Sequence, residues 1–283
     1  MIIATLTTPN GINVLLNIPE SAKEIPFSKY VSANIEYISI CERFDETKNN
    51  YSGAQLNDIV RFLSFVLDVD PKELLGLKVG NLNDITNKIA KGLDAKGTWE
   101  EVDITLYLLF DYISNIFAVE DYASKKISTF ELNGKKYNVP EYFRTALTTG
   151  SSELKAWQGL ECAEAYRHIN QYVTSIKDKL GDEDIYVSKL SDDEKDQLAQ
   201  ITYNGYMRVL ACLAQEEGTH LANIIMSGGD DVSDYIERKA NELNQIDADT
   251  ALTVFFFGLN IGEALINQLV MNMPLILHNQ QRQ

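Results

Sequence analysis

Residues 133–141 read NGKKYNVPE, and residues 10–20 read NGINVLLNIPE. Each stretch places Asn-Gly before a segment that favours a β-strand, and each ends in Pro-Glu. Asn-Gly is typical of a two-residue hairpin turn because both residues tolerate positive φ, and proline ends a strand because it has no N–H to donate. We therefore predict two β-hairpins, residues 2–18 around Asn10-Gly11 and residues 127–139 around Asn133-Gly134.

Helices are expected after each hairpin, because apolar residues there recur every three to four positions. Two helix starts are marked clearly: Asp70 precedes Pro71, and Ser191 with Glu194 makes a capping box. The helices that we predict cover residues 26–44, 54–67, 70–77, 82–93, 104–119, 191–213, 232–243 and 249–273. One more helix starts within residues 147–153, LTTGSSE, and runs to residue 179. The expected fold is mainly α with two small antiparallel β-hairpins, an α+β class.

The order of a hairpin followed by helices occurs twice, which indicates an internal duplication. We predict two related hairpin-plus-helical-bundle units, residues 1–124 and residues 125–283. Coincidence is the alternative, since Asn-Gly and proline are common turn residues.

The composition argues against a nucleic-acid partner. The 283 residues carry 41 acidic and 25 basic side chains, a net charge of −16, and such a chain repels nucleic acid unless its charges are strongly segregated. The small basic clusters Lys125-Lys126 and Lys135-Lys136 are typical of solvated hairpin charges, with a phosphate patch as the less favoured alternative.

The cysteines and the apolar segments indicate a reducing compartment and no membrane contact. Cys41, Cys162 and Cys212 are too few and too widely spaced for a disulfide framework, so we expect three buried thiols. The first residues lack the pattern of a signal peptide. The apolar stretch 251–273 contains Asn260 and Glu263, which are costly in lipid, so a buried helix explains it better than a membrane span.

One pattern resembles a metal site. Glu217 and His220 form Glu-x-x-His, a spacing that ferritin-like di-iron bundles use twice. The other half of such a site would come from Glu161, Glu164 and His168. The second set has the wrong spacing, and Gly218 weakens a helix that would have to hold the ligands. A solvated turn at residues 215–220 is therefore the favoured interpretation.

Other catalytic signatures are incomplete. Residues 92–98, GLDAKGT, imitate a P-loop but have threonine where lysine is required, and they follow an expected helix instead of a strand. Residues 228–234, GGDDVSD, lack the spaced ligands of a calcium loop. We expect no catalytic residue, no cofactor and no metal.

An interface is the remaining kind of site. The run 255–257 places phenylalanine on all sides of the expected last helix, and small residues follow it. Most of its cover should come from its own unit, and a partner subunit could supply the remainder. The residues that we predict at such an interface are Phe255, Phe257, Gly258 and Gly262, with Asn133 and Gly134 at the hairpin.

The whole series of segments resembles a protein family of tailed bacteriophages that infect Bacteroides and its relatives, including crAss-like phages. In the second half the resemblance lies in NGKKYNVP, LTTGS, YMRVLACLAQ and ERKANELNQIDADTALTVFFFGL. In the first half it lies in NIPESAKEIPFSKYVSANIEYISI and VRFLSFVLDVDPKELLGLKVGNL. The family commonly has Arg-Pro after the helix that matches YMRVLACLAQ, whereas residues 214–217 here read AQEE.

The resemblance implies a virion-associated or tail-assembly protein with no catalytic site. The leading expectation is a non-enzymatic structural or morphogenetic protein that contacts other virion proteins and copies of itself. It would be made in the host cytoplasm and then retained in the virion. A cytoplasmic tail-assembly chaperone that leaves the particle is the alternative, and a ferritin-like metal enzyme is a remote one.

Overall fold

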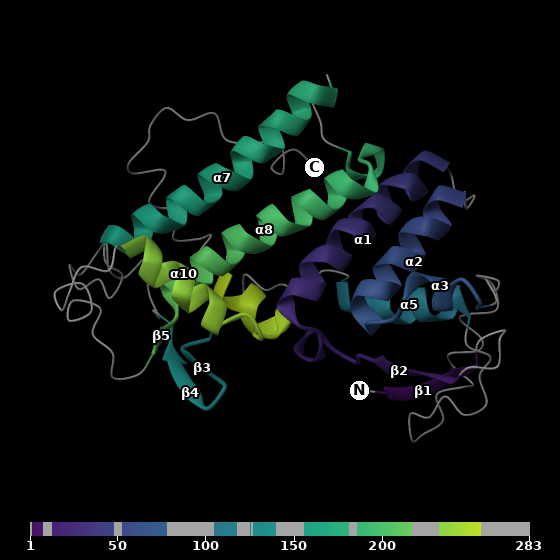
Figure 1. Cartoon of the computed structure of the whole chain (residues 1–283), viewed down its shortest axis with the longest axis horizontal. Helices are drawn as coiled ribbons and strands as arrows, with labels where there is room; N and C mark the ends of the chain where they lie inside the picture. The colour runs from purple at the N-terminus through teal and green to yellow at the C-terminus, as the bar shows by residue number, and fades with distance from the viewer. Residues whose placement is uncertain are drawn as a thin grey trace.

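The computed structural model describes residues 2–7, 13–47, 53–77, 105–117, 125, 127–139, 156–180, 186–216 and 232–255. Within them the chain is mainly helical with short antiparallel strands, so the predicted fold class is confirmed (Figure 1). The predicted helix 82–93 lies outside the described residues, and so does most of the helix predicted at 249–273.

The first hairpin pairs β1 (Ile2–Thr7) with β2 (Asn13–Ile18), with Ile2 opposite Ile18. Its expected turn at Asn10-Gly11 lies outside the described residues. Leu16 and Ile18 are fully buried while Leu15 is 57% exposed, because successive side chains of a strand point to opposite faces. One face of this hairpin therefore covers the core.

The second hairpin pairs β3 (Thr129–Leu132) with β4 (Lys135–Asn138). Asn133 and Gly134 join them with φ values of 52° and 74°, so the predicted tight turn is confirmed. The sequence did not indicate a third strand. Residues Gln215–Glu216 form β5 and pair with β4, so the solvated turn predicted at residues 215–220 is wrong for its first two residues.

Four long helices form a row in the order α2, α1, α8, α7 (Figure 1). Their bounds are α1 (Phe27–Thr47), α2 (Gly53–Leu67), α7 (Ala156–Leu180) and α8 (Asp192–Leu213). Packed around the row are α3 (Pro71–Leu74), α5 (Leu106–Phe117), α10 (Val232–Glu242) and a helix over 248–255. The short 3-10 helices are η1 (Ala22–Glu24) and η2 (Val187–Lys189).

One apolar core runs through both predicted units, from Leu16 in the first hairpin to Phe255 near the end of the described chain. A small β-bridge also joins the units: the Phe27 N–H donates to the Ile246 carbonyl and the Ala248 N–H to the Ile25 carbonyl, each at 2.9 Å. The domain boundary at 124 and 125 stays a prediction, and the buried core extends across it.

The structure contradicts the predicted burial of one of the three cysteines, and it agrees with the predicted burial of the described start of the last apolar stretch. Cys162 and Cys212 are buried, but Cys41 is exposed, because it lies about 100° around α1 from the buried Ile40. The described start of the apolar stretch, residues 251–255, is buried in the core. Among the described helices, none combines the length and the apolar character needed to cross a bilayer.

Candidate functional site

The predicted interface residues divide between the core and the surface. Phe255 is only 3% exposed, and its ring centroid lies 3.9 Å from that of Tyr206 on α8, so its own chain already covers it. Asn133 and Gly134 are exposed at the tip of the second hairpin. Phe257, Gly258 and Gly262 lie outside the described residues.

The predicted metal ligands are only partly described. Glu164 lies on the surface of α7, where Arg167 Nε donates to its Oε2 at 2.8 Å and His168 Nε2 lies 3.1 Å from its Oε1. The hydrogen bond from Arg167 lowers the pKa of Glu164 to about 2. Glu217 and His220, and the side chain of Glu161, lie outside the described residues. No three His, Cys, Asp or Glu side chains are placed to hold a metal in the part of the chain that the structure describes.

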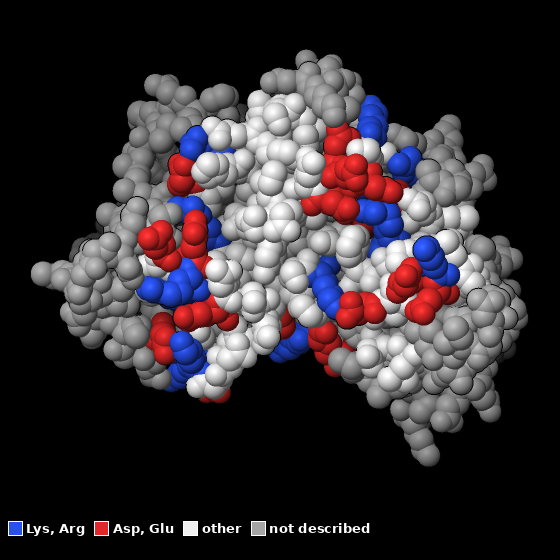
Figure 2. Space-filling view, viewed as in Figure 1, with Lys and Arg blue, Asp and Glu red and all other residues white. Residues whose placement is uncertain are grey.

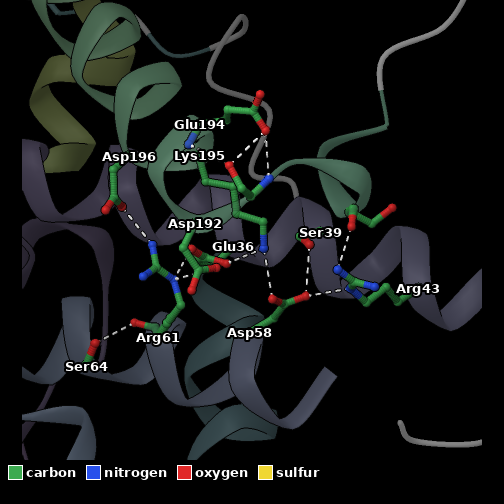
Figure 3. A network of polar contacts seen from close by, with 12 residues as sticks. Glu36, Ser39, Arg43, Asp58, Arg61, Ser64, Asp192, Glu194, Lys195 and Asp196 are labelled. Atoms are coloured by element: carbon green, nitrogen blue, oxygen red, sulfur yellow. Dashed lines mark hydrogen bonds and ion pairs between the residues drawn. The ribbon is translucent and has the colours of Figure 1, made fainter. Parts of the chain in front are cut away.

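A different polar cluster stands out, at the junction of α1, α2 and α8 (Figure 3). Lys195 of α8 places its ammonium between two carboxylates, 2.9 Å from Glu36 Oε2 and 2.8 Å from Asp58 Oδ1. Glu36 and Lys195 are 1% exposed and Asp58 2%. We call these three residues the ionic core. Charged side chains are almost never buried this fully unless they are paired.

Two arginines complete the bonding of the carboxylates. Arg61 Nε donates to Glu36 Oε1 at 2.7 Å, and Arg43 Nε donates to Asp58 Oδ2 at 2.8 Å. Burial alone would lower the pKa of Arg61, but the hydrogen bond to Glu36 and the nearby acidic charges raise it overall. Each carboxylate thus accepts hydrogen bonds from Lys195 through one oxygen and from an arginine through the other.

The first turn of α8 is tied to the same place. The Ser191 hydroxyl accepts from the Glu194 N–H and the Glu194 carboxylate accepts from the Ser191 N–H, so the predicted capping box is confirmed. Arg61 Nη2 also donates to Asp196 Oδ1 at 2.7 Å. Just before the helix, Arg43 donates to the Ser188 carbonyl, and the Ser188 N–H donates to Glu42 at 2.7 Å.

The arrangement suits a structural role better than a catalytic one. A catalytic lysine or carboxylate has to touch a substrate, whereas the three charged groups of the ionic core are closed off from solvent and bonded to one another. Such an arrangement holds three helices in one geometry. It does not offer a group to a reactant.

Sequence reasoning missed this cluster because it predicted the buried helix faces from apolar residues alone. A signal was nevertheless present. Lys195 precedes the buried Leu198 and Ala199 by three and four positions, and Asp58 precedes the buried Phe62 by four. Opposite charges at core positions of separate amphipathic helices predict a buried ion pair.

A second buried charge lies beside the small sheet. Lys239 of α10 is 5% exposed, and its Nζ lies 3.4 Å from the Tyr235 hydroxyl. Burial lowers the pKa of Lys239 to about 8. On the surface nearby, Lys135 bridges Glu216 of β5 and Glu242 of α10, at 3.3 Å from each.

Comparison with known proteins adds no relative: no protein family, no curated protein and no solved structure matches this chain.

Proposed function

We propose that this chain is a non-enzymatic structural or morphogenetic protein of a tailed bacteriophage, a head–tail or tail component that acts through protein–protein contacts. It would be made in the host cytoplasm and then retained in the virion. The resemblance of its segments to a phage protein family supports this proposal. The observation that carries the contact role is an uncharged surface in an otherwise strongly charged chain.

That surface crosses α8 and the second half of α7 (Figure 2). No charged residue occurs from Gln197 to Met207 or from Ile169 to Ile176, although 23% of all residues are charged. The two helices are joined there by a hydrogen bond of 3.2 Å between Tyr172 and Gln197. The exposed residues, which we call the uncharged band, are Asn170, Gln171, Thr174, Ser175, Gln197, Gln200 and Asn204.

A protein contact is the use that fits this band best. Charged residues are depleted at the centres of protein interfaces, where they would lose their hydration. Two copies of a chain with a net charge of −16 repel each other over most of their surfaces. The uncharged band is a place where copies can meet without apposing acidic side chains. We therefore infer a homo-oligomer, with other virion proteins as further partners.

The ionic core supports the non-enzymatic half of the proposal. Its buried charges hold α8 against α1 and α2 and do not face a ligand.

The location of the protein is tested by mass spectrometry of purified phage particles. We expect peptides of this chain at a constant ratio to the major tail proteins through successive gradients. Particles without the protein would overturn the virion role. If a deletion strain then still failed to make tails, the chaperone alternative would replace it.

The contact role is tested by adding a negative charge to the band. Asn204→Glu is expected to weaken self-association roughly tenfold or more, because like charges face each other across an interface between copies. Sedimentation equilibrium measures this effect. Asn241→Glu adds the same charge to an exposed position on α10 and should leave association unchanged. Equal behaviour of the two variants would place the contact elsewhere.

A further inference from the structure

The contact between α8 and the α1–α2 pair is built from opposite charges around the first turns of α8. Lys195 lies between Glu36 and Asp58. Arg61 of α2 lies 3.7 Å from Asp192, three residues before Lys195, and 2.7 Å from Asp196, one residue after it. Each charged group thus meets an opposite charge on the facing helix (Figure 3).

This pattern of charges strongly favours one axial alignment of α8 relative to α1 and α2. A slide of α8 by one turn, four residues or about 6 Å, would bring either Ser191 or Ala199 to the place of Lys195. Two buried carboxylates would then lose their shared cation. In one direction Lys195 would also enter the apolar cluster where Ala199 now packs with Ile35 and Ile176. Each carboxylate would keep only its arginine partner, and a buried charge that loses a partner is unfavourable.

Apolar contacts distinguish these alignments far less, because an apolar side chain gains free energy against almost any apolar neighbour. Buried ion pairs also add little net stability, since the cost of removing both charges from water offsets their attraction. The ionic core therefore contributes more to the choice of alignment than to the free energy of unfolding.

We propose that the ionic core is a register device, which selects one axial alignment of α8 on α1 and α2. The alignment of α8 in turn sets the positions of α7 and α10, which pack on it. This inference does not depend on the phage role or on the uncharged band.

The test replaces the three charges together. Glu36→Met, Asp58→Leu and Lys195→Met are combined in one variant, and Lys195→Met alone is the comparison. Arg43 and Arg61 are partly exposed, so both can turn toward water when the carboxylates are gone. We expect the single variant to show a greatly lowered Tm, and the triple variant to recover at least half of that loss.

The alignment is then read by pulsed electron paramagnetic resonance. Spin labels are attached to Cys41, which is exposed on α1, and to a cysteine introduced by Asn204→Cys on α8. Dilution with an excess of unlabelled protein limits the measured distances to those within one chain, because Asn204 belongs to the uncharged band. Cys162→Ala and Cys212→Ala limit labelling to these two sites. With the ionic core intact we expect one narrow distance. The triple variant should show a second population that corresponds to a slide of about 6 Å along α8.

A control removes an exposed ion pair that does not involve α8, between α1 and the residue that follows α2. Lys29 Nζ and Asp68 Oδ2 lie 2.8 Å apart near solvent, and Lys29→Met with Asp68→Asn should keep the single distance. Two results would overturn the proposal. One is a triple variant that keeps the single narrow distance, and the other is a triple variant no more stable than Lys195→Met alone.

Discussion

At the scale of single residues, the ammonium of Lys195 is the cation that two buried carboxylates share. Glu36 and Asp58 are buried around its ammonium, so its removal would leave two carboxylates with their shared cation missing. We expect Lys195→Met to lower the free energy of unfolding by about 3–5 kcal/mol, the usual cost of breaking a buried ion pair from one side. Urea denaturation followed by circular dichroism measures the change.

Lys29→Met is the control for this prediction. Lys29 also pairs with a carboxylate at 2.8 Å, but Asp68 is largely exposed, and exposed pairs contribute about 0–1 kcal/mol. A loss for Lys195→Met no larger than that for Lys29→Met would show that water reaches the ionic core.

Lys239 poses the opposite case, a buried cation whose surroundings disfavour its charge. Burial lowers its pKa to about 8 from an ordinary value of 10.5. Between these values the unfolded chain binds the proton and the folded chain does not, so stability rises with pH. Below about pH 8 both states are protonated and the cost of burial is fully present. We expect Lys239→Met to raise the free energy of unfolding at pH 7 by up to about 3 kcal/mol.

The pH dependence separates this effect from simple repacking. The gain from Lys239→Met should be smaller at pH 9.5 than at pH 7, and urea denaturation of both proteins at both values measures it. Arg238→Met, at an exposed neighbouring position, should differ from the parent equally at the two values. A gain from Lys239→Met that does not change with pH would contradict the assignment.

At the scale of elements, the contact between α7 and α8 depends on a glycine. A Cβ atom built at Gly205 would lie 2.5 Å from Cδ1 and 2.8 Å from Cγ1 of Ile169. Alanine would gain about 1 kcal/mol in helix propensity, but forcing an extra carbon into a packed contact costs about 1–3 kcal/mol. We expect Gly205→Ala to lower the free energy of unfolding by about 1 kcal/mol.

Two further variants test the cause. Ile169→Val in the Gly205→Ala background makes room for the new methyl group, so it should restore part of the loss. Asn204→Ala, at the exposed neighbouring position, should change stability by no more than about 0.5 kcal/mol. Thermal unfolding of four proteins tests this explanation: the parent, Gly205→Ala, Gly205→Ala with Ile169→Val, and Asn204→Ala. If Gly205→Ala were stabilising, α7 would be able to shift away without cost.

Some elements can be predicted from the local sequence pattern and others cannot. The ends of α8 follow from the capping box at Ser191 and from the last apolar position, Leu213. The pairing of β5 with β4 follows from neither, because Gln215 and Glu216 become a strand only where the chain passes the edge of the second hairpin. A two-residue strand has no periodicity of its own to detect.

At the scale of the whole molecule, the acidic charge governs how copies meet. Repulsion between two chains of net charge −16 opposes contact through the uncharged band. Salt screens this repulsion, and the screening length falls from about 30 Å at 0.01 M to about 8 Å at 0.15 M. We expect self-association to become stronger as salt rises over this range, as measured by sedimentation equilibrium.

Self-association that weakens as salt rises would contradict a contact through the uncharged band. Association that weakens with salt requires opposite charges across the contact, and it would assign the interface to the charged surface beside the band. The Asn241→Glu variant serves as the reference, because it changes the net charge without changing the band.

The sequence by itself determined the features that depend on neighbouring residues. Asn133 and Gly134 form the hairpin turn because both tolerate positive φ, and Ser191 starts α8 because its side chain caps the helix. Only the tertiary structure decided that Lys195 is buried between Glu36 and Asp58. The physical reason is distance along the chain: this environment is made by helices far apart in sequence, and the free energy of a charge depends on what surrounds it in space.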